Sequence, residues 1–566
     1  MWPFSAPNDA VINEKRQQRS QALAAVNQDI SPTQSVFLKA TASDIVSRIQ
    51  KGEWTATEVL EAYITRAAFA HAKTNCLTEV MLGPARQRAQ ELDEEFAKTK
   101  RLRGPLHGVP ISIKEQFEII GVDTSVGFSQ WANKPATTNA DIVNFLSDAG
   151  AVLFVKTNIP QTMFAFECSN PVWGRTTNPY NDRFTCGGSS GGEGALLAMD
   201  GSAVGIGTDI GGSVRIPAAY CGIYSLKPAS GRVSYQGAKG PVPGFDGIVT
   251  VAGPMGRSVT DVKLVSQVLF GAPSTNHSIP PLPFRDVKLP SKLKFDNYIK
   301  ASPACKRAVI ETVEALRAAG HECVEFEVPD ANVAFNLFAA ITSADGYKTM
   351  LSHLGPDAKE SSLFLATLGP KVPSFVRAFA SWIMESFVGD KVFADTIRAS
   401  KAKSVGEYWK LIHQRDQYVK TFIETVWKAH DFDSIIAPVQ AIPQLPHGGC
   451  DNFSVMAVAT VLYNVLDMPV GCLPVTRVDA TKDKLTDEWT TGPGLGSRFL
   501  EGGIYRGKNP LYDPEASQGM PVNIQIVGKK WEEEKVVAIM DVVDNALGRE
   551  RGFGPGAWDA HMKKSS

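Results

Sequence analysis

Apolar residues are spaced differently in successive parts of the chain, and the first part is helical in pattern. Two stretches there repeat apolar residues at helical spacing, and each follows a capping-box pair, Thr41 with Asp44 and Thr55 with Glu58. Such a pair satisfies backbone N–H groups that the first turn of a helix leaves unbonded. Residues 1–100 are therefore predicted to be a helical lead-in packed on the core.

After residue 100 the pattern changes to short β-branched runs that alternate with helical ones. VPISIK (109–114) and AVLFVK (151–156) are typical of buried strands, and NADIVNFLSDAG (139–150) between them is typical of an amphipathic helix. Similar runs return between residues 430 and 566, where the last apolar pattern is helical. This alternation predicts an α/β fold with a mixed, mostly parallel central sheet covered by helices on both faces.

Residues 286–429 interrupt the strand-rich texture with long amphipathic helical patterns and a stretch rich in Pro and Phe. We interpret them as a helical insertion, or cap, within one domain whose core is residues 101–285 and 430–566. The polar, Gly- and Pro-rich segment 478–518 is predicted to be a surface loop. The insertion's aromatic residues suggest an apolar binding site, or else simply the insertion's own core: Phe364, Phe375, Phe379, Trp382 and Phe387.

Composition excludes several classes of protein. The 566 residues carry 58 Lys plus Arg against 59 Asp plus Glu, without a basic block, so nucleic acid is not an expected partner. The eight cysteines are scattered, with no zinc-type spacing, which indicates reduced thiols and no metal site. Neither a signal-peptide pattern nor an apolar run of about 18 residues occurs, so we expect a cytoplasmic protein without a transmembrane segment.

Residues 186–219 form a glycine-rich stretch that carries two serine clusters, and three interpretations compete for it. Phosphate-binding loops need GxxxxGK[ST] or GxGxxG, and neither pattern occurs there. A nucleophile elbow, GxSxG, is matched by residues 187–191. The residues before that match are polar rather than an apolar strand, and no histidine has a distinctive setting. Cys186, beside the first cluster, is expected to be inert.

The third interpretation joins both serine clusters to the lysine of GVPISIKEQF (108–117). Together with GGSSGGEGA (187–195) and GTDIGGSVRIPAA (207–219), this segment resembles the amidase signature family. The similarity extends over most of the chain and is greatest to the fungal acetamidase and general amidase branch and to enzymes like fatty acid amide hydrolase. It implies the amidase-signature fold, with residues 101–285 and 430–566 as its catalytic core.

The resemblance also implies a reaction. The expected enzyme cleaves the C–N bond of a carboxylic amide to acid and amine through an acyl-serine intermediate, without metal or organic cofactor. Its partner would be a small-molecule amide with an aliphatic, aromatic or fatty acyl group, and the chain could associate as a homodimer. Two alternatives remain: an amidase subunit of a glutamine-dependent amidotransferase complex, and a catalytically silent scaffold.

By the same resemblance, Ser213 is the nucleophile, Ser189 relays its proton after a cis Gly188–Ser189 peptide bond, and Lys114 is the base. A lysine can accept that proton only when neutral, so its pKa must fall from about 10.4 toward 7. Burial is the expected cause, since Lys114 ends an apolar run. Glu115, however, could equally pair with a charged lysine at this position.

Residues around the two serines have expected supporting roles. Glycines leave backbone N–H groups accessible, so an oxyanion hole is expected from the N–H groups of Ile210, Gly211, Gly212 and Ser213.

Four side chains are weighed against ordinary structural roles. Ser190 is expected to support the relay, with a turn hydroxyl as the alternative. Asp209 and Arg215 are expected to hold the loop by an ion pair, with an exposed pair of little value as the alternative. Met163 is expected to bind substrate in the acyl pocket, with ordinary core packing as the alternative.

Overall fold

A central sheet runs through the computed structural model, which describes residues 8–274, 279–287, 292–294, 301–325, 331–492 and 496–565. Within these residues it has 11 strands in the order β1-β3-β2-β6-β8-β7-β12-β13-β11-β9-β10. The strands are β1 Leu77–Val80, β2 Pro110–Lys114, β3 Val152–Thr157, β6 Val204–Asp209, β7 Tyr224–Lys227, β8 Val251–Gly256, β9 Lys292–Lys294, β10 Glu322–Cys323, β11 Ser434–Pro438, β12 Val470–Arg477 and β13 Pro521–Val527. A separate hairpin pairs β4 Ser169–Asn170 with β5 Gly174–Arg175.

The α/β class and the mixed sheet are confirmed. Parallel pairing occurs in two runs, β3-β2-β6 and β11-β9-β10. Antiparallel pairs join these runs and complete the sheet, so antiparallel pairing is more extensive than the sequence predicted.

Helices cover both faces of the sheet. In β12, a Cβ on Gly471 would meet α20, whereas the next residue, Cys472, contacts the main chain of α8. Since neighbouring residues of a strand face opposite sides, α8 and α20 lie on opposite faces. α7 packs beside α8, while α9 and α10 pack beside α20. The bounds are α6 Asp141–Asp148, α7 Gly191–Ala198, α8 Arg215–Cys221, α9 Val259–Leu269, α10 Pro303–Ala318, α20 Glu533–Leu547 and α21 Ala557–Ser565.

The N-terminal residues are helical as predicted, with one strand among them. Both predicted capping boxes are present, at the starts of α3 and α4. β1 was not predicted because its four residues separate two long helices, and it pairs with β3 at the edge of the sheet. The helices are α1 Asp9–Ala24, α2 Pro32–Leu38, α3 Ala42–Gln50, α4 Ala56–Thr74 and α5 Leu82–Thr99.

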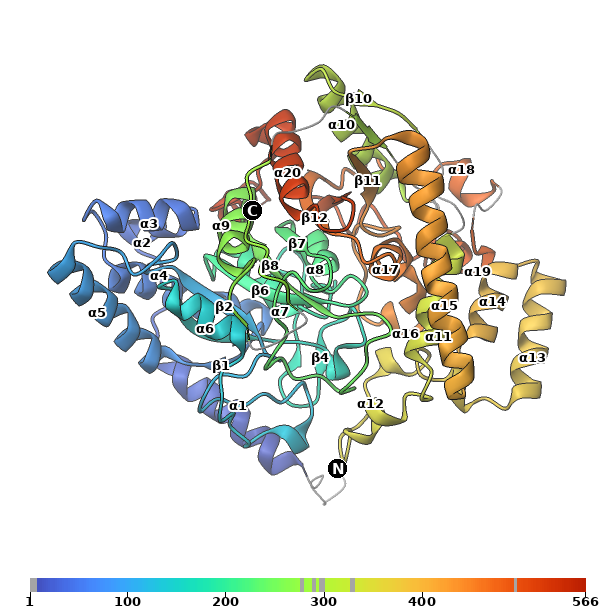
Figure 1. The fold of residues 1–566 in the computed structure, drawn as a ribbon, viewed down its shortest axis with the longest axis horizontal. Coiled ribbons are helices and arrows are strands. Elements are labelled where there is room, and N and C mark those ends of the chain that lie inside the picture. Colours follow the sequence, from blue (N-terminus) through green and yellow to red (C-terminus); the bar gives the residue numbers. More distant parts are fainter. Residues whose placement is uncertain are drawn as a thin grey trace.

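The predicted insertion divides into a core part and a cap. β9 and β10 join the central sheet, and α10 packs against β11, β13 and α20, so the first part belongs to the core. The helices that follow form the cap, and α13, α14 and α15 lie on the far side of the molecule from α1–α5 (Figure 1). Cap helices are α11 Ala331–Thr342, α12 Lys348–Ser352, α13 Ser374–Ile383, α14 Lys391–Ala399 and α15 Val405–Phe422.

The segment 478–518 differs from the predicted surface loop. It contains α18 Asp487–Thr490 and α19 Arg498–Tyr505, and Leu500, Ile504 and Tyr505 of α19 are buried. Although the glycines and prolines of this segment are typical of a loop, α19 is an amphipathic helix that packs on the core. Upstream, α16 Cys450–Phe453 and α17 Val458–Val465 precede β12.

Among the described residues, the helices are all too short or too polar to cross a bilayer.

Candidate active site

The three residues expected to react come from three segments that meet at one edge of the sheet. Lys114 is the last residue of β2, and Ser213 follows the end of β6. β2 and β6 are parallel neighbours, so their carboxyl ends lie together. Ser189 lies two residues before the start of α7, which packs against both strands. Ligand sites of α/β sheets lie at this edge, beyond the carboxyl ends of the strands.

The Lys114 amine is buried and hydrogen-bonded only to hydroxyl groups in the described part of the chain. Its Nζ donates to Ser189 Oγ at 2.7 Å and to Thr208 Oγ1 at 2.8 Å. The Thr208 hydroxyl in turn donates to Gln116 Oε1 at 2.6 Å. Burial lowers the pKa of Lys114 to about 7, against smaller opposing effects of Asp209, Cys168 and Glu193. A substantial fraction of the amine is therefore neutral near pH 7.

Glu115 does not pair with the lysine. Its carboxylate accepts hydrogen bonds from Ser125 N–H and Oγ and from Val126 N–H. The Glu115 carboxylate therefore binds the loop after β2 rather than the Lys114 amine, because successive residues at a strand end point to opposite sides.

The two serine clusters are joined through the main chain. Ser190 N–H donates to the carbonyl of Ser213 at 3.1 Å, and the Gly188–Ser189 peptide bond is cis. The Ser213 hydroxyl makes no hydrogen bond within the described residues, and it lines two cavities. This hydroxyl is therefore accessible to a small molecule. The expected hydrogen bond from Ser213 to Ser189 is not among those of the described residues, where Ser189 Oγ is bonded to Lys114 Nζ, so the contact between the two serines stays a prediction.

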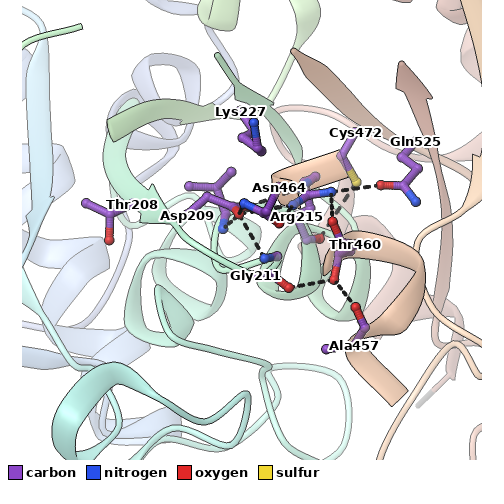
Figure 2. A network of polar contacts seen from close by, with 12 residues as sticks. Thr208, Asp209, Gly211, Arg215, Lys227, Ala457, Thr460, Asn464, Cys472 and Gln525 are labelled. Carbon is purple, nitrogen blue, oxygen red and sulfur yellow. Dashed lines mark hydrogen bonds and ion pairs between the residues drawn. The ribbon is translucent and has the colours of Figure 1, made fainter. Parts of the chain in front are cut away.

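A buried ion-pair network holds the turn between β6 and α8 (Figure 2). Asp209 and Arg215 are both fully buried, and Arg215 Nη2 lies 3.0 Å from Asp209 Oδ1. The pair is therefore not the exposed surface pair of the alternative interpretation. Asn464 Nδ2 donates to Asp209 Oδ1 at 2.8 Å, and Arg215 donates to Asn464 Oδ1 at 2.6 Å and to Gln525 Oε1 at 3.2 Å. Burial is the largest single effect and would raise the pKa of Asp209, but the Arg215 and Lys227 charges and the hydrogen bonds from Arg215 and Asn464 together outweigh it and hold that pKa well below its usual value.

The predicted oxyanion role of Gly212 needs correction. Its N–H donates to Asp209 Oδ1 at 2.8 Å, so this donor is engaged in the turn. A Cβ at Gly212, where φ is +125°, would lie 2.4 Å from Thr460 Oγ1, so the glycine is needed for packing. Ile210, Gly211 and Ser213 have N–H groups without a hydrogen bond in the described structure, and they remain the candidate donors.

Ser190 and Met163 differ in their relation to the cavities. The Ser190 hydroxyl bonds only the main chain of Thr208, donating to its carbonyl at 3.4 Å and accepting from its N–H at 3.3 Å. It therefore fixes the strand that carries Thr208 and does not reach the reacting atoms. Met163 is partly exposed, has φ of 60° and lines both cavities. It also packs against the buried cluster of Val126, Phe128 and Ile159, so its role as a substrate contact stays a prediction.

The nucleophile-elbow interpretation has no support in the described residues. Ser189 Oγ contacts Lys114 Nζ, and neither Ser189 nor Ser190 is hydrogen-bonded to a histidine. Cys186 is fully buried, and burial raises the pKa of its thiol well above the usual value, so it is poorly suited to nucleophilic attack.

Two cavities of different character meet at Ser213. The smaller has a volume of about 350 Å³ and an apolar wall that includes Phe335, Phe338, Ala339, Phe393, Ile397 and Val461. Arg377, the charged residue of that wall, donates to the main-chain carbonyls of Gly369 and Val372. The larger cavity has a volume of about 850 Å³ and more polar lining, including Gln116, Glu118, Tyr235, Asp246, Asp345 and Tyr408.

The aromatic residues singled out in the cap do not line either of the two cavities. Phe375 and Phe387 are 75% and 74% exposed, and Phe364, Phe379 and Trp382 are also exposed. They are neither the wall of the cavity nor an insertion core. The cavity instead uses α11, whose largely apolar sequence ANVAFNLFAAIT is the signal that could have identified it.

Comparison with known proteins identifies the family. The family model described as Amidase matches residues 58–537 of the chain. The chain therefore belongs to the amidase family and is an amide-hydrolysing enzyme.

Relatives and a solved structure agree over nearly the whole length. An acetamidase of Emericella nidulans is 32% identical over 539 residues, which cover 92% of this chain and 91% of that protein. Fatty-acid amide hydrolase 1 of Sus scrofa is 33% identical over 516 residues, covering 89% and 85%. A solved fatty acid amide hydrolase structure superposes with a TM-score of 0.80 at 28% identity, covering 97% of this chain and 92% of that one.

Proposed function

We propose that the chain hydrolyses carboxylic amides through an acyl-Ser213 intermediate, with Ser189 and Lys114 as the proton relay. The supporting observation is the environment of Lys114. Its amine is fully buried, lies 2.7 Å from Ser189 Oγ, and forms no ion pair within the described residues. A lysine held in this way can be neutral at working pH and can accept a proton.

The proposed reaction begins with a proton transfer. Neutral Lys114 accepts the proton of Ser189, Ser189 accepts that of Ser213, and Ser213 Oγ forms a bond to the substrate's carbonyl carbon. The negative charge moves to the carbonyl oxygen, where the N–H groups of Ile210, Gly211 and Ser213 would stabilise it.

Collapse of this tetrahedral intermediate breaks the C–N bond. The relay returns its proton to the departing nitrogen, which leaves as a neutral amine, while the acyl group stays on Ser213. Water then attacks the ester after giving its proton to the same relay, and the carboxylic acid leaves with Ser213 restored.

The two cavities support a division of the substrate. We place the acyl group in the smaller cavity, because its apolar wall suits a hydrocarbon or aromatic portion and its volume of about 350 Å³ exceeds what an acetyl group fills. The amine portion would enter the larger, more polar cavity. Glutamine, with two charged groups, is a poor match to the apolar wall, so the amidotransferase alternative gains no support from it.

A substrate panel tests this function. Purified protein would be assayed with acetamide, benzamide, a lactam and a long-chain acyl amide, and Ser213 would be probed with a fluorophosphonate. We expect hydrolysis to be faster for benzamide and the long-chain amide than for acetamide, and labelling that Ser213→Ala abolishes. Labelling that persists in Ser213→Ala, or inertness toward every amide, would exclude the proposal.

A further inference from the structure

A buried carboxyl group lies behind the lysine, and the proposed relay does not use it. Glu193 occupies the first turn of α7 and is fully buried. Its Oε2 is 2.6 Å from Ser112 Oγ, and its Oε1 is 2.8 Å from Thr157 Oγ1. The described residues offer it no ion-pair partner, although a buried carboxylate ordinarily has one.

The two hydroxyl partners of Glu193 flank Lys114. Ser112 precedes Lys114 by two residues on β2, so both side chains point to the same face of the sheet. Thr157 is the residue opposite Lys114 in the register of β2 with β3. Glu193 itself belongs to the helix that follows Ser189, so its carboxyl group connects both strands beside the lysine to the helix beside the serine.

The glycines around this group leave room for it. A Cβ at Gly205 of β6 would lie 2.0 Å from Glu193 Oε2, so a side chain there would displace the carboxyl group. A Cβ at Gly192 would lie 2.3 Å from the backbone nitrogen of Asn158, so the start of α7 is pressed against the end of β3. Two of the chain's many glycines thus serve the approach of α7 to the sheet.

We propose that Glu193 is a positioning residue that, as an uncharged carboxylic acid, ties β2 and β3 to α7 and thereby holds Lys114 Nζ at Ser189 Oγ. The proposal rests on the proposed function, in which this contact carries the proton. The two hydroxyl groups are placed to donate to the Glu193 oxygens, and a protonated carboxyl group can keep both contacts by accepting from one hydroxyl and donating to the other.

The electrostatics favour an uncharged acid at this position. Burial raises the pKa of Glu193 to about 8, so the group is mostly protonated near neutral pH. The titratable groups that act on it or that it acts on are Lys114 and Cys76. A carboxylate here would favour the ammonium form of Lys114 and oppose its role as a base. The neutral acid supplies the hydrogen bonds without that charge.

The test compares Glu193→Gln with Glu193→Ala in pH profiles of kcat and KM on an amide that the wild type hydrolyses. Gln keeps both hydrogen bonds and no charge, so we expect kcat within about threefold of wild type and an unchanged midpoint of the acidic limb. Ala removes both bonds, so we expect kcat to fall at least tenfold with KM changed less than twofold. Glutamine rescue with this split is not expected of a residue that only stabilises the fold.

Two results would overturn the proposal. If Glu193 were charged, Gln would remove a negative charge, lower the pKa of Lys114 and shift the acidic limb to lower pH by about one unit. If the hydrogen bonds of Glu193 to Ser112 and Thr157 were unimportant, Glu193→Ala would have the kcat of the wild type. Should Glu193→Ala fail to fold, the double variant Ser112→Ala/Thr157→Val removes the same two bonds, and wild-type kcat in it would equally exclude the role.

Amide hydrolysis and Ser213 labelling of the wild type distinguish a failure of this inference from a failure of the proposed function. If the wild type neither hydrolyses amides nor labels at Ser213, the proposed function fails and the inference falls with it. If the wild type is active and labelled, while Glu193→Ala has the same kcat, only the inference fails.

Discussion

At the scale of single residues, Lys114 is held where its charge is costly. Its pKa of about 7 lies far below the ordinary value of 10.5, with burial as the main cause. Between these two pH values the unfolded chain binds more protons than the folded chain, so this residue's effect on stability improves as pH rises. Keeping the amine neutral costs about 4 kcal/mol at pH 7. Such a cost is typical of a functional group rather than a structural one.

We therefore predict that Lys114→Met stabilises the protein while abolishing activity. The gain should be about 2 to 4 kcal/mol at pH 7, because the lost bonds to Ser189 and Thr208 offset part of it, and it should shrink as pH approaches 10. Urea denaturation across this pH range measures it. Lys98→Met, at an exposed site, is the control and should show no such trend. A destabilised Lys114→Met protein at pH 7 would contradict the account of the buried amine.

The sequence already pointed to much of this residue-scale chemistry. Lys114, Ser189, Asp209 and Ser213 stand in motifs whose resemblance to the amidase signature family implies their proximity. Thr208, Gln116 and Glu193 lie inside the same quoted motifs but were not identified, because their roles depend on which strand face meets which helix. That relation follows from packing between distant segments and has no local signal.

At the scale of secondary structure elements, the connection from β6 to α8 is fixed by a buried network rather than by its glycines alone. Asp209 accepts hydrogen bonds from Gly212 N–H and Val214 N–H, and Arg215 donates to the carbonyl of Thr460 on α17. The loop that carries Ser213 is thereby joined to a helix that precedes the last strands of the core. Removing one charge would leave the other buried without its ion-pair partner.

We predict that Arg215→Met destabilises the protein by about 3 to 5 kcal/mol, because Asp209 is left uncompensated. In the wild type the depressed pKa of Asp209 contributes stability above its ordinary value near 4, and this is lost as pH falls further. Chemical denaturation at pH 7 provides the comparison. The exposed pair of Arg48 with Glu53 is the matched control, and Arg48→Met should leave the midpoint unchanged. Equal effects of the two variants would show that the Asp209–Arg215 pair is not important.

Elements with strong local signals were predictable, and short or ambiguous ones were not. The capping boxes of α3 and α4 and the apolar strands β2 and β3 follow from local pattern. β1, β9 and β10 have two to four residues each, so their place in the sheet is decided by pairing with distant strands. In α19 the buried side chains are separated by glycines that locally resemble a loop.

At the scale of the whole molecule, the cap and the core together define two spaces on either side of Ser213. α11 and α14 of the cap and α17 of the core enclose the smaller one. The composition of the cap indicated an apolar site, but the residues that form it could not be deduced. Exposed and buried aromatic side chains have the same sequence signature until the helices are placed.

The division between the two spaces predicts a change of specificity. Ala339→Phe would fill the smaller cavity, so kcat/KM should fall at least tenfold for a long-chain acyl amide and change less than threefold for acetamide. Ala344→Phe, in the larger cavity, is the matched variant and should instead discriminate against bulky amine groups. Measuring kcat/KM of both variants on amides that differ separately in the size of the acyl group and of the amine group tests these predictions. An equal fall of kcat/KM for acetamide and for the long-chain acyl amide in Ala339→Phe would show that the acyl group does not occupy the smaller cavity.

The central claim is that a neutral, buried Lys114 activates Ser213 through Ser189. Its most direct test is the pH dependence of the rate at which a fluorophosphonate acylation mimic labels Ser213 in a single turnover. We predict a rate that rises with pH through a midpoint near 7, since the lysine must lose its proton to act as a base, and a loss of at least a hundredfold in Lys114→Ala. A labelling rate that is independent of pH between 5 and 9, or unchanged in Lys114→Ala, would contradict the account.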